Sequence, residues 1–94
     1  MTSIAQYKLA GRLDGANAAV HEQTLRALLT GEVHSININM ADLSYVSSAG
    51  LRVLLTTAKG AKARGGAVVL SSPQPAVLDV LKVSGFDTIL EIKA

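Results

Sequence analysis

The sequence predicts an α/β fold with a mixed, mainly parallel β-sheet covered by about three major helices. Segments with strand-like and helix-like hydrophobic spacing alternate along all 94 residues, which is typical of parallel sheets joined by helical crossovers. Hydrophobic residues make up 49% of the chain and charged residues 17%, a balance that supports a packed core and excludes intrinsic disorder. The length suits one domain, so residues 1–94 are expected to fold as a single unit.

The N-terminal half contains two expected strands and one expected helix. Apolar and polar side chains alternate over residues 4–13, which predicts a half-buried strand. Asn17 is the expected N-cap of a helix that runs to about Leu29 and ends before Gly31. Residues 34–40 alternate strictly and predict a second strand with one buried face.

The C-terminal half continues the alternation. A second helix is expected to begin at Ser47 or Ser48 and to end near Arg64. Its apolar residues recur at helical spacing and predict a buried stripe of Leu51, Leu54, Leu55, Ala58 and Ala61. A short buried strand at 67–70, a third helix that starts in the SPQP segment and ends at Gly85, and a last strand at 88–92 complete the prediction.

Composition argues against several classes of partner. The net charge is only +2, no long run of Lys or Arg occurs, and aromatic residues make up 3% of the chain, so nucleic-acid binding is not expected. Lys59, Lys62 and Arg64 are expected to be a solvated helix face. No apolar run approaches the length of a membrane span, and no secretion signal is visible. We therefore expect a cytoplasmic protein that does not insert into membranes.

The residues of common catalytic and cofactor sites are also missing from the pattern. The chain has no Cys, and His21 and His34 have no further ligands at metal-binding spacing. The segment SSAG is not a nucleophile elbow, and the glycines form neither a dinucleotide fingerprint nor a P-loop. The sequence therefore predicts no metal, no cofactor and no enzymatic activity, and both histidines are expected at the surface or its boundary.

The candidate functional region is segment 41–52, ADLSYVSSAGLR. The expected order is the end of a strand, a tight loop and two serines at the start of a helix. Functional groups in α/β sheets gather beyond the carboxyl ends of the strands, and a helix N-terminus accommodates an anion. A phosphate on Ser47 or Ser48 would add nearly two negative charges there and act as a switch. The simpler interpretation, which the local pattern alone favours, is that one serine only caps the helix.

Segment 42–54, DLSYVSSAGLRVL, resembles the signature of STAS domains, and specifically that of the bacterial anti-sigma factor antagonists. Three more segments resemble the family in order and spacing. GRLD at 11–14 resembles the turn before the first helix, Ser72-Pro73 the turn before the third, and VSGF at 83–86 the end of the third helix. The similarity extends over nearly the whole chain.

This resemblance implies a phosphoprotein of a bacterial partner-switching module that controls transcription. In the family, the unphosphorylated protein binds a serine-kinase anti-sigma factor and thereby frees sigma. The kinase phosphorylates one serine of the loop, which abolishes binding, and a PP2C-type phosphatase reverses the step. Ser48, two residues before Gly50, aligns with the phosphoacceptor, while Ser47 is a rival because it stands where many members carry Asp. Ala49 replaces a second Ser of many members.

Other site residues carry alternatives. Asp14 either contacts the partner, as the equivalent acidic residue does in similar proteins, or caps a turn. Val46 and Leu51 are apolar candidates that also fit the core, and Asp42 is expected to form a turn. Arg52 either pairs with a phosphate four residues earlier or is solvated. The expected partner-binding set is Asp14, Val46, Ser47, Ser48, Gly50, Leu51 and Arg52.

The chain departs from the family at its N-terminus, where the first family strand is expected to be shortened or absent because only Met1-Thr2-Ser3 precede Ile4. An uncovered strand edge invites pairing with another chain, so a homodimer is a hypothesis. Two other functions remain open on the same fold: a non-switching scaffold or subunit of a stressosome or a lipid transporter, and a sensor of a small ligand.

Overall fold

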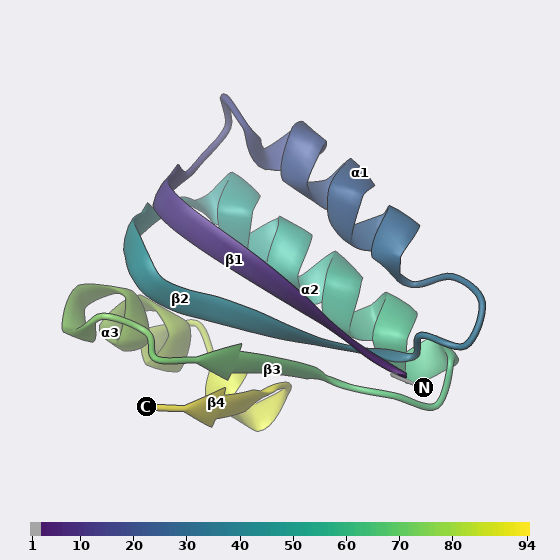
Figure 1. Ribbon diagram of the computed structural model, residues 1–94. Coiled ribbons are helices and arrows are strands. Elements are labelled where there is room, and N and C mark those ends of the chain that lie inside the picture. The colour runs from purple at the N-terminus through teal and green to yellow at the C-terminus, as the bar shows by residue number, and fades with distance from the viewer. Residues whose placement is uncertain (1–2) are drawn as a thin grey trace.

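A computed structural model describes residues 3–94 and contains a four-stranded sheet with its helices on one face (Figure 1). The expected α/β fold is confirmed. The elements in chain order are β1 (Ile4–Leu13), α1 (Ala18–Leu28), β2 (Ser35–Val46), α2 (Ser48–Ala63), β3 (Val68–Ser71), α3 (Pro75–Val83), the 3₁₀ turn η1 (Phe86–Thr88) and β4 (Glu91–Lys93). The first family strand is expected to be shortened or absent before Ile4; of the residues concerned, Met1 and Thr2 lie outside the described residues.

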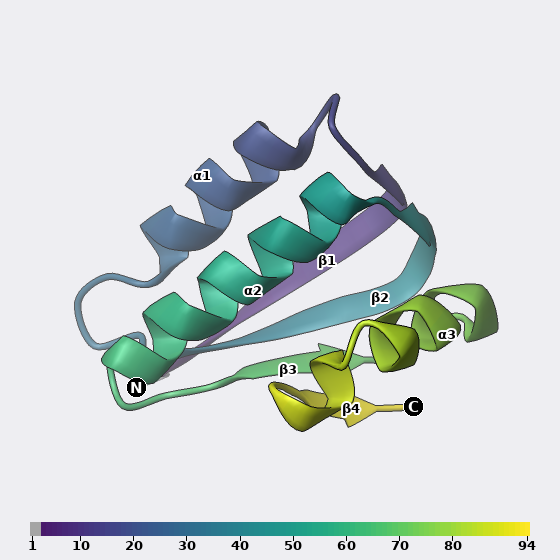
Figure 2. The same cartoon turned by 180° about the vertical axis from the view of Figure 1, so that it is seen from behind.

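The sheet order explains why the helices share one face. The strands lie in the order β1-β2-β3-β4, and all three described pairings are parallel. Crossovers of one hand that always move to the next strand in the same direction place every connecting helix on the same side of the sheet. Seen from behind, α1, α2 and α3 all lie in front of the strands (Figure 2). The molecule therefore has two layers, helices on sheet.

The core lies between these layers. The inward face of β2 is fully buried at Ile36, Ile38 and Met40, as the alternating pattern predicts. Leu25 of α1 and Leu54 of α2 are also fully buried and belong to the same cluster. The opposite face of β2 carries polar residues, and among them Asn37 donates a hydrogen bond to Gln6 of β1 at 2.8 Å. This division leaves one face of the sheet without helical cover.

The described α2 matches its predicted bounds closely, and its buried stripe differs only in part. Leu54, Ala58 and Ala61 are buried as expected, whereas Leu51 and Leu55 are half-buried. The stripe is completed by Gly50, Val53 and Thr57. No helix of residues 3–94 is long and apolar enough to cross a membrane.

The second strand is longer than its alternating pattern predicts. It ends at Val46 rather than near Met40, so the expected loop before the serines is wrong: most of that segment is strand. The pairing of β1 with β2 contains two register shifts, between Lys8 and Ala10 and between Gly11 and Arg12. Across this region, from Met40 to Val46, every third residue of β2 is buried, and an extension with that spacing is not recognised by a period-two pattern.

The last expected strand is also shorter than predicted. Residues 86–88 form η1, and β4 begins only at Glu91. Gly85 at the N-terminal end of this turn has φ of 78°, a left-handed conformation that glycine adopts without a steric penalty. The change of direction after α3 therefore uses residues that the sequence pattern assigned partly to the strand.

Candidate functional site

The start of α2 is built around the capping hydroxyl of Ser47. Ser47 has extended backbone angles, φ −94° and ψ 176°, and its Oγ accepts a hydrogen bond from the Gly50 N–H at 3.2 Å. Its backbone carbonyl accepts the first helical bond, from the Leu51 N–H at 2.8 Å. This is the geometry of an N-cap residue, which satisfies a backbone donor that the helix leaves free.

Ser48 is the first residue of α2 and its side chain is exposed. Within residues 3–94, no hydrogen bond joins its hydroxyl to another residue. The two neighbouring serines therefore differ: the Ser47 hydroxyl is engaged in the cap, whereas the Ser48 hydroxyl is open to solvent. A group attached to Ser48 would lie at the positive end of the helix dipole.

Gly50 allows this helix start to approach the ends of β1 and β2. A Cβ atom at Gly50 would lie 2.7 Å from the Leu13 carbonyl oxygen and 2.9 Å from a methyl carbon of Val46. The Ser47 N–H also donates to the Leu13 carbonyl oxygen, at 2.9 Å. The serines are thus held against the carboxyl ends of two neighbouring strands, where the sequence placed the site.

The apolar candidates differ in accessibility. Val46 is 5% exposed and belongs to the core, so its side chain is hardly accessible to a partner. Leu51 is half-buried and packs against the core cluster. Of the two, only Leu51 therefore presents part of its side chain at the surface beside Ser48.

Asp14 forms the turn that leads from β1 to α1. Its Oδ1 accepts the Ala16 N–H at 3.0 Å, and its backbone N–H donates to Asn17 Oδ1 at 2.9 Å. Asn17 precedes the helix as predicted, but its side chain makes no capping bond; its amide nitrogen donates instead to the Arg12 carbonyl oxygen at 2.7 Å. The turn role expected as one alternative for Asp14 is therefore present.

Two residues beside the serines were not singled out from the sequence. The guanidinium carbon of Arg12 lies 4.2 Å from the centre of the Tyr45 ring, and Arg12 Nε donates to Asp14 Oδ2 at 3.3 Å. Tyr45 is 43% exposed. Arg12 and Tyr45 are opposite each other in the β1–β2 register. The two residues are distant in sequence, and the pairing of these strands brings them together.

Asp42 has a different role from the one expected. It lies within β2, and its carboxylate pairs with Lys8 Nζ at 2.7 Å on the exposed surface. The predicted turn-forming role is wrong because the strand continues past this residue to Val46. An exposed ion pair of this kind contributes little to stability.

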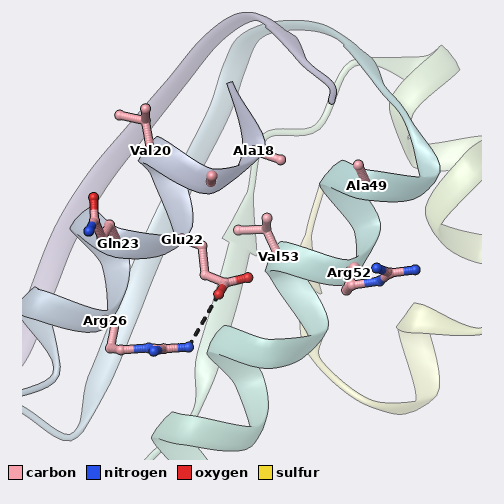
Figure 3. Close-up of a pocket in the computed structure, with 9 residues that line it drawn as sticks. Ala18, Val20, Glu22, Gln23, Arg26, Ala49, Arg52 and Val53 are labelled. Atoms are coloured by element: carbon pink, nitrogen blue, oxygen red, sulfur yellow. Dashed lines mark hydrogen bonds and ion pairs between the residues drawn. The ribbon is translucent and has the colours of Figure 1, made fainter. Parts of the chain in front are cut away.

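A shallow groove of about 520 Å³ lies between α1 and α2 next to the serines. Small side chains, including Ala18 and Ala49, contribute to its lining. Glu22 and Arg26 of α1 form an ion pair with 3.2 Å between Oε2 and Nη2, and Arg52 extends from α2 away from that pair (Figure 3). The groove is open and carries charges of both signs.

The two histidines lie apart from this site. His21 Nδ1 is 2.7 Å from the Tyr7 hydroxyl, and His34 Nδ1 is 2.8 Å from Ser35 Oγ. Both are half-buried, at the boundary of the core as predicted. Residues 3–94 contain no group of three or more His, Cys, Asp or Glu side chains placed to hold a metal ion.

Comparison with known proteins adds independent information about the family and fold of the chain. The family model described as STAS domain matches residues 2–94. BtrV of Bordetella bronchiseptica, named as an anti-sigma factor antagonist, is 36% identical over 84 residues, which are 89% of this chain and 72% of BtrV. The anti-sigma-B factor antagonist of Bacillus subtilis is 29% identical over 89 residues, 95% of this chain and 81% of that protein.

Solved structures agree with the sequence relatives. The anti-sigma factor antagonist SpoIIAA in its unphosphorylated form superposes with a TM-score of 0.82 at 25% identity, covering 100% of this chain and 84% of SpoIIAA. The phosphorylated form of the Bacillus cell fate determinant SpoIIAA gives a TM-score of 0.71 at 24% identity, covering 93% and 79%. The fold described above is therefore one that occurs in a protein solved both with and without phosphate.

Proposed function

The chain belongs to the STAS domain family, and we propose that it is an anti-sigma factor antagonist with Ser48 as its switch. In this proposal the unphosphorylated protein binds a serine-kinase anti-sigma factor in the cytoplasm and so releases sigma. Phosphorylation of Ser48 abolishes that binding, and a PP2C-type phosphatase restores it. The names of BtrV and of the Bacillus subtilis relative support the binding of an anti-sigma factor. The chain is then a substrate of enzymes rather than a catalyst.

The observation that carries the choice of Ser48 is the difference between the two hydroxyls. The Ser47 oxygen accepts the Gly50 N–H and faces the helix start, whereas the Ser48 side chain is exposed. A kinase has to bring the acceptor oxygen in line with the γ-phosphate of ATP. Ser48 meets that requirement without loss of the cap, while Ser47 would have to give up its hydrogen bond first.

The local structure also supports a switch that leaves the fold intact. A phosphate on Ser48 is stabilised by the helix dipole. The first turn of α2 contains no acidic residue that would repel it. The same phosphate places nearly two negative charges on a surface that a partner would otherwise cover. The expected effect is therefore loss of docking without unfolding.

The test is to map phosphorylation on the protein isolated from its native host, from growing and stressed cells, with phosphatases inhibited. We expect phosphate on Ser48 at a level that differs between the two conditions. Matched variants sharpen the test: Ser48→Ala should abolish the phosphate and Ser47→Ala should retain it. Phosphate confined to Ser47 would contradict the choice of residue. No phosphate in either condition would contradict the switch and favour a non-switching scaffold.

A further inference from the structure

Arg52 on α2 is a cation without an acidic partner in the part of the chain that the structure describes. Arg52 is exposed, and none of the ion pairs among residues 3–94 includes it. Two other arginines near the site are engaged. Arg26 pairs with Glu22, and Arg12 is held by Asp14 and the Tyr45 ring. Arg52 is therefore the arginine of this region whose guanidinium is available.

The position of Arg52 on the helix directs it toward the serine. Arg52 follows Ser48 by four residues within α2, so the two side chains lie on the same face, one turn apart. Side chains on a helix lean toward its N-terminus, which brings Arg52 over the turn that carries Ser48. In Figure 3 the Arg52 guanidinium points away from the Glu22–Arg26 pair.

We propose that Arg52 is the intramolecular counter-ion of a phosphate group on Ser48. The inference rests on the proposed function, since it requires Ser48 to be the residue that carries phosphate. A guanidinium offers parallel N–H donors that match two phosphate oxygens, and such charge-assisted pairs have defined geometry. No acidic residue of α2 competes for Arg52, because the helix contains none between Ser48 and Ala63.

This pairing gives phosphorylation two effects on the docking surface. The phosphate adds negative charge at Ser48, and it also draws Arg52 away from any carboxylate of the partner. A carboxylate of the partner therefore no longer finds the Arg52 cation at this surface and is repelled by the phosphate instead. Arg52 is in this sense a positioning residue for the phosphate, and it makes no contribution to phosphoryl transfer itself.

The test uses protein with phosphoserine incorporated at position 48 during translation, so that no kinase is needed. Titration by ³¹P NMR measures the second pKa of the phosphate. A nearby cation favours the dianion and lowers this pKa, so Arg52→Gln should raise it by about 0.2–0.4 units. Arg52→Lys should restore part of the difference, and added salt should reduce it.

Two matched variants serve as controls. Lys59→Gln removes a cation from the same helix far from Ser48 and should leave the phosphate pKa close to that of the parent. Arg12→Gln removes the engaged arginine beside the serines and should raise the phosphate pKa by less than Arg52→Gln does. The melting temperature of unphosphorylated Arg52→Gln should equal that of the unphosphorylated parent, because Arg52 has no described ion pair to lose. A stability change in that protein would indicate a structural role and overturn the inference.

Two NMR outcomes would also overturn the inference. One is an unchanged phosphate pKa in Arg52→Gln, and the other is a larger change in Arg12→Gln, which would assign the phosphate to Arg12. Neither outcome depends on whether phosphorylation releases a partner in the cell. Failure of the counter-ion can therefore be distinguished from failure of the switch.

Discussion

At the scale of single residues, we predict that replacing each of the two serines at the start of α2 by Ala changes the free energy of unfolding by different amounts. Ser47→Ala removes the oxygen that accepts the Gly50 N–H, and the free energy of unfolding should fall by about 1 kcal/mol. Ser48→Ala removes an exposed hydroxyl and should change it by less than about 0.5 kcal/mol. Urea denaturation of both variants measures the difference. Equal losses would show that Ser47 is not the cap in solution.

A second residue-scale prediction concerns the close approach at Gly50. The added methyl group of Gly50→Ala would lie 2.7 Å from the Leu13 carbonyl oxygen. We therefore expect the free energy of unfolding to fall by about 1–3 kcal/mol. Gly60→Ala in the same helix is the control, because its nearest contact is a flexible Leu29 methyl group at 3.4 Å. In Gly60→Ala, the higher helix propensity of Ala should raise the free energy of unfolding by up to about 1 kcal/mol. Chemical denaturation of the two variants should therefore show opposite signs.

The sequence predicted where the serines of the candidate site lie but not which residues surround them. A run of Ser-Ser before a helical apolar stripe is a local signal, and α2 starts where that signal places it. Arg12 and Tyr45 meet only through the register of β1 against β2. The register depends on two irregular positions in the pairing, which no local sequence pattern predicts, so this contact was not predictable from a single sequence.

At the scale of elements, the dipole of α2 predicts how its two ends respond to an added carboxylate. Ser48→Asp places a negative charge in a first turn that has none, and the free energy of unfolding should rise by about 0.3–1 kcal/mol. Ala63→Asp, at the exposed last residue of the same helix, should lower it by a similar amount. Thermal unfolding at low ionic strength measures both. Destabilisation by Ser48→Asp would argue against a phosphate being accommodated there.

The elements themselves were predictable to different degrees. α1 and α2 were found because their apolar residues recur at helical spacing over several turns. The distal half of β2 was missed because Asp42 and Ser44 are polar and Leu43 and Val46 are buried three residues apart. That spacing arises from the irregular pairing with β1, a property of two strands together rather than of either strand alone.

For the whole molecule, the outer edge of β1 makes self-association the main prediction. Within residues 3–94, β1 pairs with β2 only, so one edge of a ten-residue strand has no partner strand in the described sheet. Such an edge invites pairing with a second copy. Sedimentation velocity should then show a concentration-dependent rise in mass toward a homodimer. A monomer throughout a wide concentration range would contradict this hypothesis.

The scarcity of aromatic side chains has a practical consequence for observing the proposed switch. The chain has no Trp and only two tyrosines, so tyrosine emission is not masked by energy transfer to an indole. Tyr7 hydrogen-bonds to His21 of α1, whereas Tyr45 is half-exposed, packs against the Arg12 guanidinium and directly precedes Val46 and the serines. In a Tyr7→Phe background, intrinsic fluorescence would come from Tyr45 alone. The molecule thus carries its own optical reporter for events at Ser48, with no dye attached.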